Sequence, residues 1–166
     1  VIEEVYFAGS TTPEGKQYLA DQYIKIYNNS DSVLYADGLV ILESAFKTSQ
    51  KYDYTPDIMS RAMAVQCVYA IPGNGKDYPV QPGKSLLICD KAIDHREANS
   101  NSFDLSNADF EWYDDSDKNP DIDNPQVTNL DKIYSYTKTT WSLHNQGLCA
   151  YAIARLQVDK NTFLTD

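Results

Sequence analysis

The sequence predicts an all-β protein: a β-sandwich of about seven or eight short strands joined by loops of very unequal length. Short apolar segments with a two-residue alternation recur along the chain, and segments rich in Gly, Pro, Asn and Asp separate them. Tyrosine is abundant, with 13 Tyr against 5 Phe and 2 Trp, and Tyr suits half-buried sheet surfaces. At 166 residues the chain has the length of one domain, so we expect a single domain over residues 1–166 with no helix longer than about three turns.

The first half of the chain contains the more regular strand patterns. VIEEVYFA at the start is β-prone, and Ile24 and Ile26 alternate with more polar neighbours. Turns are expected at residues 28–31, where Asn, Ser and Asp bond their own backbone, and at Asp37-Gly38 inside SVLYADGLVILESAF. Residues 47–57 are polar and Tyr-rich and predict a long loop. DIMSRAMAVQCVYAI, which follows, is ambiguous: its first half is compatible with a helical turn, and its second half predicts a strand.

The second half alternates strands with longer loops. PGNGKDYPVQPG predicts a loop and leads into the strand KSLLICDKAI. Residues 99–129 predict a long polar loop. Its anchors would be Phe103, Leu105, Phe110 and Trp112, with residues 114–123 projecting as an acidic loop. We expect a bound cation or a partner chain to order this segment, and contact with the body of the domain is the alternative. Two last strands are expected in KIYSYTKTTWSL and GLCAYAIARLQV, separated like a hairpin by Asn145-Gln146-Gly147. We expect one core face to comprise Ile24, Ile26, Leu39 and Ile41, and the opposite face Leu86, Ile88, Tyr151 and Ile153.

Charge and cysteine content exclude several classes of function. A net charge of −10 disfavours nucleic acid and anionic membrane surfaces, because both attract Lys/Arg patches. Cys67, Cys89 and Cys149 each lie in an apolar run, which is typical of buried thiols, although a Cys67–Cys89 disulfide is the alternative. No segment approaches the roughly 20 apolar residues of a membrane-spanning helix. The chain begins without Met, so we interpret it as part of a longer protein.

Several segments together resemble a known family. VIEEVYFAGS followed by QYIKIYNNSDSVLYADGL, PGKSLLICDKA and WSLHNQGLCAYAIA resemble lamin-tail-type immunoglobulin-like domains. DKAIDHREANSNSFDLSNADFEWYDD and DNPQVTNLDKIYSY are similar to the DUF4876 branch of exported Bacteroidetes proteins. The resemblance covers nearly the whole chain and rests on motifs that are mostly structural.

The resemblance implies a non-enzymatic role at the cell surface. It implies an immunoglobulin-like sandwich within an exported lipoprotein of the outer membrane, held to the membrane only through a lipid anchor outside this segment. The implied function is that of a binding or scaffold subunit accessory to a TonB-dependent transporter, with that transporter or other surface lipoproteins as partners. Two alternatives stay open: a module that binds glycans or metal-bearing compounds for adhesion or nutrient capture, and, more remotely, a hydrolase.

An acidic stretch provides the candidate metal site. Asp115, Asp117, Asn119 and Asp121 have the alternating oxygen ligands of calcium loops. Pro120 and Gln126 stand where a full EF-hand loop needs Gly and Glu. Calcium is therefore the candidate cofactor, and a solvated acidic loop is the alternative.

Aromatic residues provide the candidate binding surface. Tyr and Trp contribute strongly to interfaces because they combine large rigid area with a polar tip. The candidates in or beside loops and strand ends are Tyr52, Tyr54, Tyr113, Trp112, Tyr134 and Tyr136. Packing at sheet edges is the alternative explanation for them.

Two further positions carry specific chemistry. His95 has the acidic residues Asp90, Asp94 and Glu97 near it in sequence, so the hydrolase hypothesis pairs it with a carboxylate. No nucleophile motif accompanies it. Asp31-Ser32-Val33 matches a short pattern that predicts O-glycosylation of Ser32.

Overall fold

The protein is mostly β-structure arranged in several sheets, with almost no helix. The computed structural model describes residues 1–114, 116, 120–137, 139–156 and 158–165. Within this part of the chain, the helical elements are a single 3-10 turn (His95–Glu97) and α1 (Lys160–Thr165), which agrees with the expected absence of long helices. No helix among the described residues is long and apolar enough to cross a membrane.

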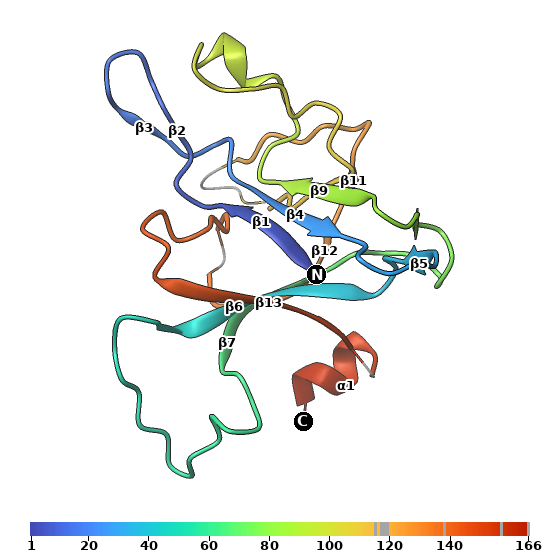
Figure 1. Cartoon of the computed structure of the whole chain (residues 1–166). Helices are drawn as coiled ribbons and strands as arrows, with labels where there is room; N and C mark the ends of the chain where they lie inside the picture. The colour runs from blue at the N-terminus through green and yellow to red at the C-terminus, as the bar shows by residue number, and fades with distance from the viewer. Residues whose placement is uncertain (115, 117–119, 138, 157, 166) are drawn as a thin grey trace.

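Two larger sheets form the body of the protein. Sheet 1 has the order β1 (Ile2–Tyr6), β4 (Tyr23–Tyr27), β9 (Ser85–Cys89), β10 (Phe110–Glu111) and β11 (Thr128–Asn129). Sheet 2 has the order β12 (Asp131–Ser135), β7 (Val65–Ala70), β6 (Leu39–Lys47) and β13 (Cys149–Arg155). Two small two-stranded sheets, β2 (Ser10–Thr11) with β3 (Gln17–Tyr18) and β5 (Leu34–Tyr35) with β8 (Pro79–Val80), complete the strands. In Figure 1, β1, β4 and β9 lie in one layer and β6, β7 and β13 in the other.

The main core lies between the two sheets. Ile24 of β4 is the cross-strand partner of Ile88 of β9, and both are fully buried. From sheet 2, Ile41 and Tyr69 join the same cluster. All eight predicted core residues belong to this cluster or pack against it, but their division into faces was wrong. β4 pairs with β9, and β6 pairs with β13, so each predicted face combines residues of both sheets.

The outer face of sheet 2 carries a smaller apolar cluster. Val40, Val68 and Ala70 are buried there, and Leu156 and Phe163 pack against them. Phe163 belongs to α1, the next element after β13. The C-terminal helix therefore covers one outer face, as Figure 1 shows.

The segment 99–129 is more integrated into the fold than a loop prediction implies. It contains β10, which pairs in parallel with β9, and β11, which pairs in parallel with β10. Phe110 and Trp112 are 1% and 0% exposed and belong to the main core. We expected a bound cation or a partner chain to order this segment, with the body of the domain as the alternative. The described part packs on the body of the domain.

The two last strands do not form a hairpin, which corrects our expectation. β12 and β13 lie at opposite edges of sheet 2, with β7 and β6 between them. The apolar patterns of both strands were visible in the sequence. Their pairing was not, because it depends on partners that come much earlier in the chain.

Candidate functional site

A long loop, residues 48–64, projects from the end of sheet 2 (Figure 1). A row of aromatic contacts begins at β6, where the rings of Phe46 and Tyr52 lie 6.0 Å apart and are tilted by 53°. The Tyr52 and Tyr54 rings follow at 6.5 Å and are inclined by only 21°. Tyr52 is 39% exposed, and its hydroxyl donates to Gln50 Oε1 at 3.1 Å. The loop thus presents stacked phenol rings to solvent.

Two further predicted binding residues lie on β12 and directly after it, beside β7. The Tyr136 backbone N–H donates to the carbonyl oxygen of Gln66 at 2.9 Å, and Gln66 is the second residue of β7, immediately after the loop. Tyr134, on the edge strand β12, pairs with Val68. Their exposed fractions are 42% for Tyr134 and 64% for Tyr136. We call Tyr52, Tyr54, Tyr134 and Tyr136 the tyrosine surface.

A buried carboxylate lies within sheet 2 near the tyrosine surface. Glu43 on β6 is 2% exposed, and its Oε1 accepts from the side-chain amide of Gln66. Burial raises the pKa of Glu43, and hydrogen bonds from Gln66 and Tyr151 oppose that rise. Burial also raises the pKa of Tyr136, and the charge of Glu43 contributes to that shift. The interior beside the tyrosine surface therefore contains a buried carboxylate and its amide partner.

Two features of the sequence indicate this region, although our predictions did not use them. Glu43 is the single charged residue in the apolar run LVILESAF, and such a residue must be hydrogen-bonded if the strand is buried. Phe46 ends the same run directly before the Tyr-rich loop. Both positions contribute to the end of sheet 2 that carries the tyrosine surface.

The two other predicted aromatic residues lie elsewhere. Trp112 is 0% exposed, and its indole N–H donates to the carbonyl oxygen of Trp141 at 3.2 Å. Tyr113 is half-buried. Trp112 therefore cannot touch a partner directly, and we exclude it from the candidate surface.

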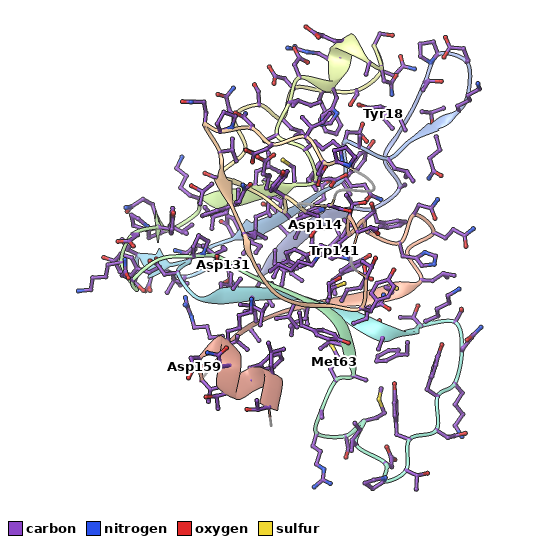
Figure 2. All side chains as sticks on the ribbon, turned by 180° about the vertical axis from the view of Figure 1, so that it is seen from behind. Tyr18, Met63, Asp114, Asp131, Trp141 and Asp159 are labelled. Atoms are coloured by element: carbon purple, nitrogen blue, oxygen red, sulfur yellow. The ribbon has the colours of Figure 1, made fainter. Side chains whose placement is uncertain are left out.

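Asp114 points inward, which corrects our expectation that residues 114–123 project as one acidic loop. It is 2% exposed and accepts from Tyr69 Oη at 2.9 Å, Lys132 Nζ at 2.6 Å and the Trp141 N–H at 2.6 Å. Figure 2 shows Asp114 and Trp141 close together in the middle of the molecule. Asp114 thus joins its own segment to β7, β12 and the stretch before β13.

The predicted calcium ligands are only partly covered by the structure. Asp115, Asp117 and Asn119 lie outside the described residues. Asp121 Oδ1 is 2.8 Å from Lys91 Nζ, and its Oδ2 accepts from the Asp114 N–H at 3.2 Å. In the described part of the chain, no group of three or more His, Cys, Asp or Glu residues is arranged to hold a metal. The calcium site stays a prediction, and Lys91 supplies the positive charge beside Asp121.

His95 is fully buried and serves a local hydrogen-bond network. Nδ1 lies 2.9 Å from the Tyr18 hydroxyl, and Nε2 lies 2.9 Å from the Lys91 carbonyl oxygen. The carbonyl can only accept, so Nε2 carries the proton and Nδ1 accepts from Tyr18. Burial lowers the pKa of His95. The hydrolase hypothesis required His95 at a pocket and hydrogen-bonded to an acid, and these contacts do not provide that arrangement.

Ser32 lies in an exposed turn between β4 and β5. Its carbonyl oxygen accepts from the Asn28 side chain at 2.9 Å, which holds the turn against β4. The position is therefore accessible, and O-glycosylation of Ser32 stays a prediction.

The three cysteines are free and buried in the structure, as the apolar runs predicted. Burial raises the pKa of Cys67 to about 11 and raises the pKa of Cys89 further. Such thiols stay protonated at neutral pH, so they are poor nucleophiles and poor metal ligands. They contribute to packing.

Comparison with known proteins identifies the family. The family model described as a protein of unknown function, DUF4876, matches residues 81–166, just over half of the chain. The crystal structure of a DUF4876 family protein from Bacteroides thetaiotaomicron superposes with a TM-score of 0.77 at 25% identity. The match covers 95% of this chain but 42% of that protein, so the chain spans less than half of its relative's length. No curated protein matches. From the family match and the fold together, we conclude that this chain belongs to the DUF4876 family.

Proposed function

We propose that this chain is the immunoglobulin-like, lamin-tail-type β-sandwich domain of an exported outer-membrane lipoprotein, and that it acts by binding rather than by catalysis. In this proposal the lipid anchor lies outside the segment. The partner is a TonB-dependent transporter or a neighbouring surface lipoprotein. The two sheets that share one apolar core support the sandwich assignment. The greater length of the relative supports a role within a larger protein.

The tyrosine surface is the observation that carries the binding proposal. Aromatic residues concentrate in binding hot spots, whereas a folded domain normally buries most of its large rings. Here Tyr136 is 64% exposed while Tyr69 and Trp141 are almost fully buried. The exposed rings also lie on a projecting loop and on an edge strand, which are the parts of a sandwich that a partner can reach.

Charge limits the kind of partner that this domain accepts. The net charge of −10 repels nucleic acid and anionic lipid headgroups at long range. A protein partner with a neutral or basic face fits both the charge and the exposed tyrosines. Tyrosine tolerates such faces because its ring packs against apolar groups and its hydroxyl bonds polar ones.

Co-purification from native outer membranes tests this proposal. The variant carries Tyr52→Ser, Tyr54→Ser and Tyr136→Ser, and the control is Val33→Ser. Val33 has the same 39% exposure as Tyr52 but lies in the turn before β5. We expect a transporter or surface lipoprotein to co-purify with wild type and control but not with the triple variant. Recovery of the wild type as a free monomer at every detergent condition would contradict the proposal.

Glycan binding is a second candidate, because Tyr52 and Tyr54 present stacked, partly exposed rings. Sugar rings pack on such faces through their apolar C–H groups. Calorimetry against a broad glycan panel separates the two candidates, because heat that is lost in the triple variant would assign the tyrosine surface to sugars. Absence of heat with every glycan would leave protein binding as the function of the tyrosine surface.

A further inference from the structure

An apolar pocket opens at the other end of the sandwich, away from the 48–64 loop. Its volume is about 240 Å³. Sheet 1 contributes Ile26 and Leu86, which are cross-strand partners, and sheet 2 contributes Leu39 and Ile153. Leu34 of β5 and Val80 of β8, themselves a strand pair, close one side. The pocket therefore lies where the two sheets separate and the small β5–β8 sheet spans part of the gap.

Arg155, the last residue of β13, also lines this pocket and has an unneutralised charge. Its guanidinium donates to two backbone carbonyl oxygens, those of Asp37 and Tyr35. These bonds fix the planar group but leave three of its five N–H donors unused. Arg155 forms no ion pair with any described residue. The carboxylate of Asp37 instead accepts from backbone N–H groups of the 75–78 loop.

The rest of the lining is complementary to an anion. None of the described residues that line the pocket is Asp or Glu, although acidic residues outnumber basic ones by 24 to 14 in the whole chain. An apolar cavity with a fixed guanidinium matches a ligand with an apolar tail and a planar anionic head.

From this arrangement we infer that the pocket binds a small amphipathic carboxylate. The class comprises medium-length aliphatic acids and arylalkanoic acids, whose tail lies between the sheets and whose carboxylate pairs with Arg155. The volume is just below the ~300–1,000 Å³ of pockets for drug-sized ligands, which limits the tail to roughly eight carbons. This inference does not depend on the tyrosine surface, because none of the pocket residues belongs to it.

Binding of octanoate to the purified chain tests the inference, with neutral 1-octanol as the matched probe. We expect saturable one-to-one binding of octanoate by calorimetry, with methyl NMR shifts at Ile26, Leu39 and Val80. We expect 1-octanol to bind at least tenfold more weakly, because it lacks the charge that pairs with Arg155. Failure of octanoate to bind, or equal affinity for the two probes, would overturn the inference.

Two variants locate the head group. Arg155→Gln should weaken octanoate at least tenfold without changing the affinity for 1-octanol. Leu34→Asp places a negative charge at the mouth, where Leu34 is 47% exposed, so it should also weaken octanoate without disturbing the core. Arg61→Gln, an exposed Arg in the 48–64 loop, is the control and should bind as wild type does. Unchanged octanoate affinity in both pocket variants, with melting temperatures near that of wild type, would place the carboxylate elsewhere.

Discussion

Asp90 should make the stability of this domain depend on pH in an unusual direction. It follows β9 directly and is 4% exposed. Its Oδ2 lies 3.3 Å from Lys91 Nζ, and its Oδ1 has no hydrogen-bond partner among the described atoms. Burial raises the pKa of Asp90 from 3.8 to about 7, with Lys91 opposing the rise and Asp121 adding to it. Between these two values the folded protein holds a proton that the unfolded chain releases.

The free energy of unfolding therefore falls as pH rises from about 4 to about 7. Below pH 4 Asp90 is protonated in both the folded and the unfolded state, so its burial costs no stability. Above pH 7 it is charged in both states, and the folded protein bears the full free-energy cost of burying that charge. A pKa difference of about three units corresponds to about 4 kcal/mol as a ceiling. Asp90→Asn removes the titration and keeps the shape of the side chain. Lys91 keeps its second acidic partner, Asp121, at 2.8 Å.

Urea denaturation at pH 5, 6, 7 and 8 measures this effect, with fluorescence of the buried Trp112 and Trp141 as the signal. We expect Asp90→Asn to gain several kcal/mol relative to wild type between pH 5 and pH 8. Burial also raises the pKa of Glu43 and Glu111, but both remain in the variant, so the difference isolates Asp90. Asp31→Asn in the exposed turn is the control. Parallel curves for wild type and Asp90→Asn across this range would refute the argument.

Three further predictions concern packing, backbone conformation and metal. Cys89→Ser should lower the free energy of unfolding by roughly 1–3 kcal/mol in urea denaturation, because it places a hydroxyl in a fully buried position; a neutral result would show that the site is wetter than described. Gly147 has a φ of +64°, and an added Cβ would lie 2.7 Å from the Phe7 ring. Gly147→Ala should therefore lower the free energy of unfolding by at least about 1–2 kcal/mol in urea denaturation. Gly15→Ala, at a similar φ but with open space around it, is the control and should lower it by less. If residues 115–121 form a calcium loop, millimolar calcium should raise the melting temperature of wild type but not of a variant with Asn at Asp115, Asp117 and Asp121; no rise in wild type would leave this segment without a metal.

The local strand patterns could be predicted from sequence because they depend on neighbours along the chain. The alternation around Ile24 and Ile26 and the Asp37-Gly38 turn both appear in the structure. The assignment of residues to sheets could not be predicted in the same way. β4 pairs with β9, which lies about sixty residues later in the chain. β10 pairs in parallel with β9, and β11 pairs in parallel with β10, with irregular segments between them in sequence. A two-residue strand such as Phe110–Glu111 has no periodicity to detect.

The candidate site was also predicted only in part, because residue type is visible in the sequence but burial is not. Tyr52, Tyr54, Tyr134 and Tyr136 were identified because Tyr in loops and at strand ends is visible in sequence. Trp112 satisfied the same criterion but is buried in the core. Sequence proximity to a loop does not distinguish an exposed ring from one that anchors the loop. The pocket beside Arg155 was not predicted, because it combines residues from five separate regions of the chain.

The acidity of the chain is partly structural, and this bears on function. Glu111 accepts from the backbone N–H groups of Ala92 and Asn124, and Asp114 accepts from that of Trp141. Each carboxylate thereby satisfies donors that an irregular segment leaves unpaired, which is a recurrent need in a fold with long loops between short strands. These buried acids are occupied by backbone groups, so they are not available as ligands or bases for a substrate. The tyrosine surface at one end and the Arg155 pocket at the other are, by contrast, accessible, and the groups in both are suited to recognition.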